Sequence, residues 1–259
     1  MANKASERHN ERGIELALKG WEAEALCEFE KAIVHDPEFA PPYDNIANVY
    51  AERGQHLEAL KLYIRALELA PDDSTIHYNF GCFLSNYASD MAIAAYRHAG
   101  QSASSFPEVH LNLGMSLMAG GHMGEAIEQL QIATQAAPND AAASYELACA
   151  LLQTGQFKEA VSEFRRATLK DPEQQAAWFQ LGSCYLQQGF YTEANNALAR
   201  ALQLEPKDPF CLCELACLRH LQGQEKESQT LLEKGLKLDR PGVESRILKT
   251  PHLKILKRP

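Results

Sequence analysis

Apolar residues recur at helical spacing in pairs of short segments along the chain. Trp178, Leu181 and Tyr185 lie three or four residues apart, as they would on one face of a helix. Gly189 interrupts this segment, and a second segment rich in Ala and Leu begins at Tyr191. The period-two alternation that is typical of strands does not occur. The pattern therefore predicts an all-α chain built from pairs of helices.

The interruptions repeat with a fixed period. Glycines recur at Gly20, Gly54, Gly121, Gly155, Gly189 and Gly223. Prolines recur at Pro37, Pro71, Pro138, Pro172 and Pro206. Neighbours are 34 residues apart, except for one gap of 67 in each series. Because proline lacks a backbone N–H and restricts the residue before it, each proline ends a helix. A unit of two antiparallel helices therefore repeats, and one unit has lost a residue.

This period predicts seven repeats and two terminal segments. The repeats are expected at residues 6–39, 40–73, 74–106, 107–140, 141–174, 175–208 and 209–242. The third is one residue short near Tyr87–Asp90, and the seventh is degenerate, as repeats at the end of an array usually are. Residues 1–5 are expected to form a leader. Residues 243–259 are expected to form a basic cap that is helical to about Lys249 and loose after Pro251.

Small residues hold fixed positions in both predicted helices. In the first helix they are Gly13, Ala47, Gly81, Gly114, Ala148, Gly182 and Ala216. The second helix carries alanines such as Ala160 and Ala167, and a large residue such as Phe29 or Phe164 at a complementary position. A minimal Cβ lets helix axes approach near the lower end of the ~8–10 Å range. We therefore expect each helix pair to pack closely.

The segment Trp178-x2-Leu181-Gly182-x2-Tyr185, followed by Ala194, Leu198 and Pro206, resembles the tetratricopeptide repeat. Leu198 stands where that pattern has an aromatic residue. Six other windows fit less completely, and the resemblance spans residues 6–242. It implies a right-handed superhelical solenoid of antiparallel helix pairs with a C-terminal capping helix. It also implies that the first helices line a concave groove that binds protein segments.

The resemblance assigns residues to this groove. They are Asn45, Asn48, Tyr78, Asn79, Leu111, Asn112, Met115, Met118, Tyr145, Cys149, Phe179, Phe210, Cys213 and Cys217. The N-terminal members are polar, whereas the central and C-terminal members are mostly apolar. Exposed apolar strips usually mark binding sites, and Met and aromatic side chains suit an adaptable surface. The alternatives are that these side chains pack between adjacent helices, or that the basic C-terminal segment folds back over them.

The sixth repeat position forms a polar row that reads Asn45, Asn79, Asn112, Glu146, Gln180 and Glu214. Since an amide both donates and accepts hydrogen bonds, the asparagines could hold a peptide backbone. The row is similar to the asparagine ladder of the repeat domain in O-linked N-acetylglucosamine transferases. Local capping or solvent exposure is the alternative. Asn10, Asp44 and Tyr78 stand where co-chaperone domains of this family place a basic carboxylate clamp, so we do not expect that mode of binding.

Cys213, Cys217 and His220 share a helix face and could present three soft ligands to a metal. Cys82, Cys149 and Cys217 occupy one equivalent register, however, which favours cysteine as a small apolar packing residue. We therefore expect no metal and no cofactor. Enzyme signatures such as Gly-x4-Gly-Lys and His-Glu-x-x-His do not occur, so we expect no catalytic activity.

Charge narrows the kinds of partner. The formal net charge of −9 disfavours nucleic acid. No apolar run is long enough to span a membrane, and seven cysteines without an export signal predict a cytoplasmic protein. Residues 243–259 carry a net charge of +4, and the rest of the chain carries −13.

The leading expectation is a scaffold or adaptor that binds a protein or peptide segment. The alternatives are a self-assembling homo-oligomer, joined through solenoid ends or the basic tail, and an accessory subunit of an enzyme or of a secretion or assembly complex.

Overall fold

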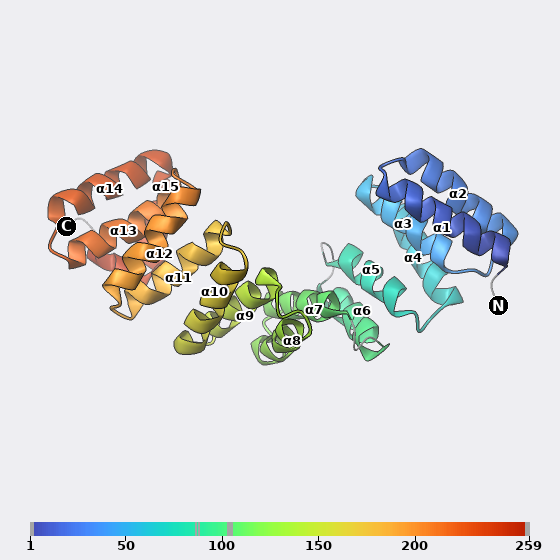
Figure 1. The fold of residues 1–259 in the computed structure, drawn as a ribbon, viewed down its shortest axis with the longest axis horizontal. Coiled ribbons are helices and arrows are strands. Elements are labelled where there is room, and N and C mark those ends of the chain that lie inside the picture. Colours follow the sequence, from blue (N-terminus) through green and yellow to red (C-terminus); the bar gives the residue numbers. More distant parts are fainter. Residues whose placement is uncertain (1–2, 86, 88, 103–105, 257–259) are drawn as a thin grey trace. The chain divides into compact units, whose positions relative to one another are not determined.

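The computed structural model describes residues 3–85, 87, 89–102 and 106–256. Every regular element in these residues is helical, which confirms the all-α prediction. The chain divides into two compact units, Met1–Ala136 and Ala137–Pro259. Figure 1 shows the helices of both units.

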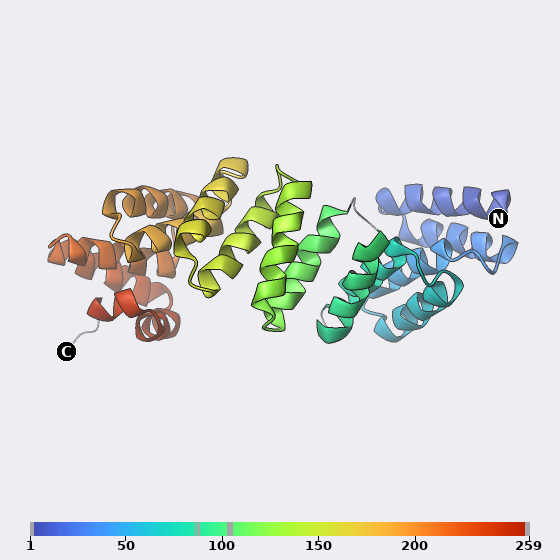
Figure 2. The same cartoon turned by 90° about the horizontal axis from the view of Figure 1, so that it is seen from below.

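The unit Met1–Ala136 contains four antiparallel helix pairs. In chain order its helices are α1 (Lys4–Leu18), α2 (Glu22–His35), α3 (Pro41–Glu52), α4 (His56–Leu69), α5 (Ser74–Leu84), α6 (Ser89–Ser102), α7 (Pro107–Ala119) and α8 (Met123–Ala136). The two helices of each pair lie side by side (Figure 2), and each pair contacts the next. The shortened turn predicted near Tyr87 includes Ala88, which lies outside the described residues.

The unit Ala137–Pro259 contains three pairs and a C-terminal segment. Its helices are α9 (Ala141–Gln153), α10 (Phe157–Lys170), α11 (Gln175–Gln187), α12 (Tyr191–Leu204), α13 (Pro209–Leu221), α14 (Glu225–Leu238), α15 (Arg240–Lys249) and the 3-10 helix η1 (Pro251–Leu256). Below, the first helices are α1, α3, α5, α7, α9, α11 and α13, and the second helices are their partners. Helix α1 begins at Lys4, within the expected leader. The other helices of these pairs fall within the seven repeat ranges expected from the sequence, whose boundaries stay a prediction.

The periodic glycines supply the turn within a pair. Gly155, between α9 and α10, has a φ of 78°, in the left-handed region that only glycine enters at little cost. Five further glycines at the equivalent position have φ between 73° and 81°. The backbone geometry of this turn therefore explains why glycine recurs at this position.

Close packing within a pair explains the small residues. A Cβ atom on Gly182 of α11 would lie 2.6 Å from Cγ of Leu198 on α12, which is closer than real carbon atoms approach. In the preceding pair, Ala160 and Phe164 of α10 are both fully buried. The expected match of a small residue on one helix with a bulky one on its partner is thus present in the structure.

Contacts between successive repeats are also periodic. The indole Nε1 of Trp178 donates to the carbonyl oxygen of Pro172 at 3.0 Å, and the hydroxyl of Tyr43 makes the equivalent bond to Pro37. The carboxylate of Asp208 accepts from the first backbone N–H groups of α13 and so caps that helix. A proline carbonyl, bound by an aromatic side chain, or an aspartate cap thus fixes the start of the first helix at these junctions.

The C-terminal segment differs from its expectation in one respect. Helix α15 ends at Lys249, as expected for the cap. The following residues were expected to be loose, yet they form η1, in which Leu253 is fully buried. The physical reason is that η1 turns back onto α13 and contributes Leu253 and Leu256 to the same apolar core as Cys213 and Cys217.

A larger side chain at a buried alanine tests how closely the two helices of a pair pack. We expect Ala160→Leu to lower the free energy of unfolding by about 1–3 kcal/mol, because its extra carbon atoms have no space among buried neighbours. Urea denaturation followed by circular dichroism measures the change. Leu169→Ala is the control on the same helix, since Leu169 is 78% exposed and its removal should change stability by less than about 0.5 kcal/mol. Equal effects of the two substitutions would contradict the packing account.

Candidate functional site

A row of side-chain hydrogen bonds joins the first helices of the unit Met1–Ala136. Asn45 Nδ2 donates to Asn10 Oδ1 at 2.9 Å, and Asn79 Nδ2 donates to Asp44 Oδ2 at 2.7 Å. In the next repeat, Asn112 Nδ2 lies 3.3 Å from the hydroxyl of Tyr78. Each asparagine therefore binds the residue at the fifth position of the preceding repeat. These amides brace neighbouring first helices, a role that differs from the exposed ladder considered from the sequence.

Asp44 lies buried within this row and is only 4% exposed. Burial raises the pKa of its carboxyl group to about 7, although the hydrogen bond from Asn79 acts in the opposite direction. Nearby, the hydroxyl of Tyr63 donates to Asn48 Oδ1 at 2.6 Å. Asn48 is therefore engaged with the second helix α4 of its own pair. The N-terminal part of the expected groove is thus polar, and its asparagine side chains are hydrogen-bonded within the chain.

An open cavity of about 390 Å³ lies between α5 and the start of α7. It is lined by Ser74, Thr75, Tyr78, Asn79, Phe106, Glu108 and Val109. Phe106 is 44% exposed, and Tyr78 is half-buried. The cavity therefore combines two aromatic rings with a carboxylate on the surface of the first helices. Tyr78 and Asn79 were expected in the groove, whereas Phe106 was not, because it precedes α7 in the junction between repeats.

Helix α7 carries three further residues that were expected in the groove. Leu111 and Met118 are half-buried, and Met115 is 43% exposed. Their spacing places them on one face of the helix. This helix belongs to the unit Met1–Ala136, whereas Tyr145, Cys149, Phe179, Phe210, Cys213 and Cys217 belong to the other unit. A single continuous strip through both sets stays a prediction.

In the second unit, Tyr145 and Cys149 are half-buried on α9. The ring of Tyr145 meets Phe164 edge-on, with 5.8 Å between the ring centres. Burial raises the pKa of the Cys149 thiol to about 12, so this cysteine is a neutral thiol rather than a reactive thiolate at neutral pH. Tyr145 and Cys149 therefore place an aromatic ring and a neutral thiol on this part of the first-helix surface.

A buried charge cluster holds the C-terminal segment against α13. The Glu214 side chain is fully buried on α13. Arg246 Nη2 donates to its Oε1 at 2.7 Å, and His252 Nε2 lies 2.7 Å from its Oε2. Ser183 of α11 also donates to Oε1, at 3.2 Å. Burial by itself would raise the pKa of Glu214, but His252 and Arg246 together lower it, so the carboxylate is ionised.

The last four residues expected in the groove lie at or beneath this segment. Phe179, Cys213 and Cys217 are buried, and Phe210 is half-buried. The guanidinium group of Arg246 lies 4.8 Å from the ring centre of Phe179 and 5.7 Å from that of Phe210. This placement differs from the open groove expected at these positions. The chain's own C-terminal segment covers them, which is one of the alternatives the sequence left open.

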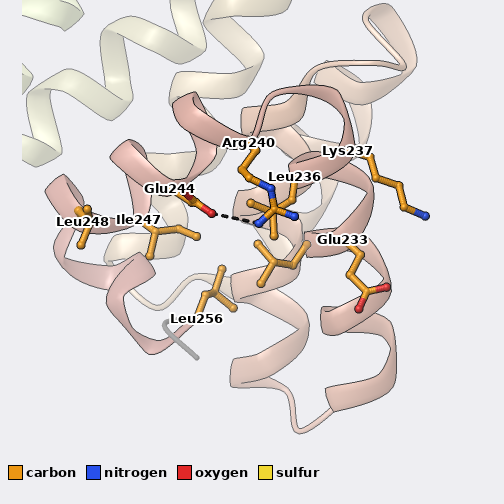
Figure 3. Close-up of a pocket in the computed structure, with 9 residues that line it drawn as sticks. Glu233, Leu236, Lys237, Arg240, Glu244, Ile247, Leu248 and Leu256 are labelled. Atoms are coloured by element: carbon orange, nitrogen blue, oxygen red, sulfur yellow. Dashed lines mark hydrogen bonds and ion pairs between the residues drawn. The ribbon is translucent and has the colours of Figure 1, made fainter. Parts of the chain in front are cut away.

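The outer side of the C-terminal segment is loosely packed. A cavity of about 620 Å³ opens between α14, α15 and η1 (Figure 3). It is lined by Leu232, Glu233, Leu236, Lys237, Arg240, Glu244, Ile247, Leu248 and Leu256. Arg240 and Glu244 form an ion pair at its rim, 3.2 Å apart. The segment is therefore held more firmly on the side that faces α13.

Of the three residues considered as metal ligands from the sequence, Cys217 and His220 have other partners, and Cys213 is fully buried. Cys217 Sγ donates to the carbonyl oxygen of His252 at 3.4 Å, and His220 pairs with Glu225 at 2.7 Å. Among the described residues, no group of three or more His, Cys, Asp or Glu side chains has the arrangement of a metal site. The same residues include no helix that is both long enough and apolar enough to span a membrane.

Two sequence models of known protein families match segments of this chain. The model described as "Tetratricopeptide repeat" matches residues 111–167 and 145–209, and one described as "TPR repeat" matches residues 47–82. Together these windows span just over half of the chain. The chain belongs to the tetratricopeptide repeat family. A comparison with curated proteins finds no significant match.

Solved tetratricopeptide repeat structures share the fold. YrrB, described as a TPR protein with an unusual peptide-binding site, is 27% identical, with a TM-score of 0.64 over 71% of this chain and 95% of YrrB. PilW, a type IV pilus biogenesis factor, is 22% identical, with a TM-score of 0.68 over 79% of this chain and 94% of PilW. PilF of Pseudomonas aeruginosa is 18% identical, with a TM-score of 0.66 over 85% of this chain and 97% of PilF.

Sequence reasoning did not anticipate the roles of Arg246 and His252. The signals that could have found them are a glutamate in the otherwise apolar segment Pro209–Leu218 and the basic character of the C-terminus. A buried carboxylate requires a positive partner, and the only strongly basic stretch follows α14. The pairing itself is long-range, because Arg246 and His252 follow Glu214 by 32 and 38 positions in the sequence.

The raised pKa of Asp44 makes stability depend on pH. The folded pKa of about 7 exceeds the unfolded value of about 4, so between these values the folded chain binds more protons. Stability should therefore fall as the pH rises from about 4 to 7. We expect Asp44→Asn to raise the free energy of unfolding at pH 8 by on the order of 2 kcal/mol and to have little effect at pH 4.

Urea denaturation at the two pH values measures this difference. Asp90→Asn is the control, because Asp90 is an exposed residue in the first turn of α6. A pH profile of Asp44→Asn that runs parallel to the profile of the unaltered chain would contradict the account of Asp44.

Proposed function

We propose that the protein is a non-catalytic interaction scaffold that binds a helical or extended segment of another protein on its first helices. The observation that carries this proposal is the cavity between α5 and α7, where Tyr78 and Phe106 are accessible from solvent. Apolar and aromatic surface of this kind is typical of binding sites. YrrB, which shares the fold, is described as having a peptide-binding site, and this likeness supports the proposal.

The neighbouring residues suit a segment with alternating polar and apolar side chains. Met115, at 43% exposure, offers a flexible thioether surface on α7. Glu108, at the rim of the cavity, favours a basic side chain on the partner. Tyr145 and Cys149 offer a comparable half-buried surface on α9 of the other unit. The apolar contacts would supply most of the affinity, and the polar groups would supply orientation.

A selected peptide tests the proposal. Peptides of about 15 residues would be selected from a displayed random library against the full chain, labelled and measured by fluorescence anisotropy. We expect the double substitution Phe106→Ala and Met115→Ala to raise the Kd about tenfold or more, because it removes the accessible apolar contacts.

Met91→Ala is the matched control, since Met91 is 55% exposed but lies on the second helix α6. It should change the Kd less than twofold. If Met91→Ala in the protein raised the Kd of the peptides and the double substitution did not, binding would lie on the second helices. That result would contradict the proposal.

A further inference from the structure

Residues Arg240–Leu256, called the C-terminal segment here, occupy the surface of α11 and α13 in the manner of a bound peptide. Arg246 supplies a cation to Glu214 and stacks on Phe179. His252 binds the other carboxylate oxygen, and Leu253 is fully buried in the apolar core of this unit. Basic, aromatic-stacking and aliphatic contacts thus all come from one short stretch of chain.

The buried carboxylate dictates what can occupy this surface. Without a cation, Glu214 would be an ionised group with its full charge shut away from water, which is strongly unfavourable. If the C-terminal segment leaves, Glu214 must meet water, take up a proton or receive a positive charge from another molecule. A segment that brings no cation would therefore bind only at the cost of protonating Glu214, and an acidic segment would add repulsion. The surface therefore favours a ligand that carries an arginine, or a protonated histidine, beside aliphatic side chains.

Some features of the C-terminal segment favour its release. An open cavity interrupts its packing against α14 (Figure 3), although Leu232 of α14 still shares its apolar core, and Leu248 of α15 stays exposed. Arg246 Nε is buried without a hydrogen-bond partner among the described residues. A buried donor that is left unpaired weakens the fit of its own segment. An incoming segment that satisfied this donor would therefore compete with it.

We propose that the α11–α13 surface around Glu214, Phe179 and Phe210 is a binding site for a basic, aliphatic segment of a partner protein, and that the C-terminal segment occupies this site as a built-in competitor. The site lies wholly in the unit Ala137–Pro259. It is independent of the cavity between α5 and α7, so either proposal can fail alone.

The thiols beneath the C-terminal segment report its release in the unaltered full chain. Burial raises the pKa of both Cys211 and Cys217 to about 12. Cys217 lies against His252, whereas Cys211 faces α12 and donates to the carbonyl oxygen of Leu198. We expect iodoacetamide to alkylate Cys217 at least tenfold faster than Cys211, as measured by mass spectrometry of the peptides. Equal rates would mean that the thiols are exposed only by global unfolding, and would overturn the proposal.

A peptide that supplies the missing basic side chains to Glu214 tests whether this surface binds a separate ligand. The probe is a labelled peptide with the sequence of residues 240–256, measured by anisotropy against full-length chains. The double substitution Arg246→Ala and His252→Ala removes both basic side chains that bind Glu214 and so weakens the built-in competitor. We expect this variant to bind the probe at least tenfold more tightly than the unaltered chain does. A probe in which the arginine and histidine corresponding to Arg246 and His252 are alanine should bind at least tenfold more weakly to the same variant.

Two matched variants complete the test. Arg240→Ala also removes a cation from α15, but Arg240 pairs with Glu244 and not with Glu214, so its probe affinity should equal that of the unaltered chain. Adding Glu214→Gln to the double variant should remove the preference for the basic probe over the alanine probe. Failure of the double variant to bind the probe, or equal binding of both probes, would show that the C-terminal segment is a structural cap only. If the double variant does not fold, the alkylation rates of the unaltered chain decide the question.

Discussion

Close contact between the two helices of each pair is the constraint on which the rest of the structure depends. It requires a residue with little or no side chain on one helix wherever a bulky residue projects from the other, as Gly182 and Leu198 show. It also requires a tight turn with one residue in the left-handed region of φ, which Gly155 and its equivalents provide. Because each pair is built in this local way, the outward surface of the first helices is free to vary between repeats. In this tetratricopeptide repeat protein, the outward surface of the first helices accordingly differs between the N-terminal and the C-terminal repeats.

The two units use their first helices in different ways. In the unit Met1–Ala136, Asn45 and Asn79 join neighbouring helices, and the accessible apolar surface begins at the cavity near Phe106. In the unit Ala137–Pro259, a single buried carboxylate gathers two basic side chains from the C-terminal segment. Polar groups thus join neighbouring first helices in the first unit and hold the C-terminal segment in the second.

Much of the fold could be predicted because its determinants are local. The positions of Gly155, Pro172 and Ala160 follow from turn geometry, helix termination and close packing, each of which acts over a few residues. Much less of the candidate site could be predicted. Tyr78 and Met115 were assigned to an accessible surface and lie on one, but Phe179 and Cys217 are covered. The same helical register thus places some side chains in the open and others beneath the C-terminal segment.

By itself, the sequence determined the helix pairs, their period and the family, because a repeated local pattern leaves little choice of backbone. Only the tertiary structure decided that the basic C-terminus lies against α13 and that the asparagines bind preceding repeats. The reason is range. The Glu214–Arg246 and Glu214–His252 contacts join residues 32 and 38 positions apart, and no local preference marks such partners. They meet because a buried carboxylate is stable only where folding brings a cation to it.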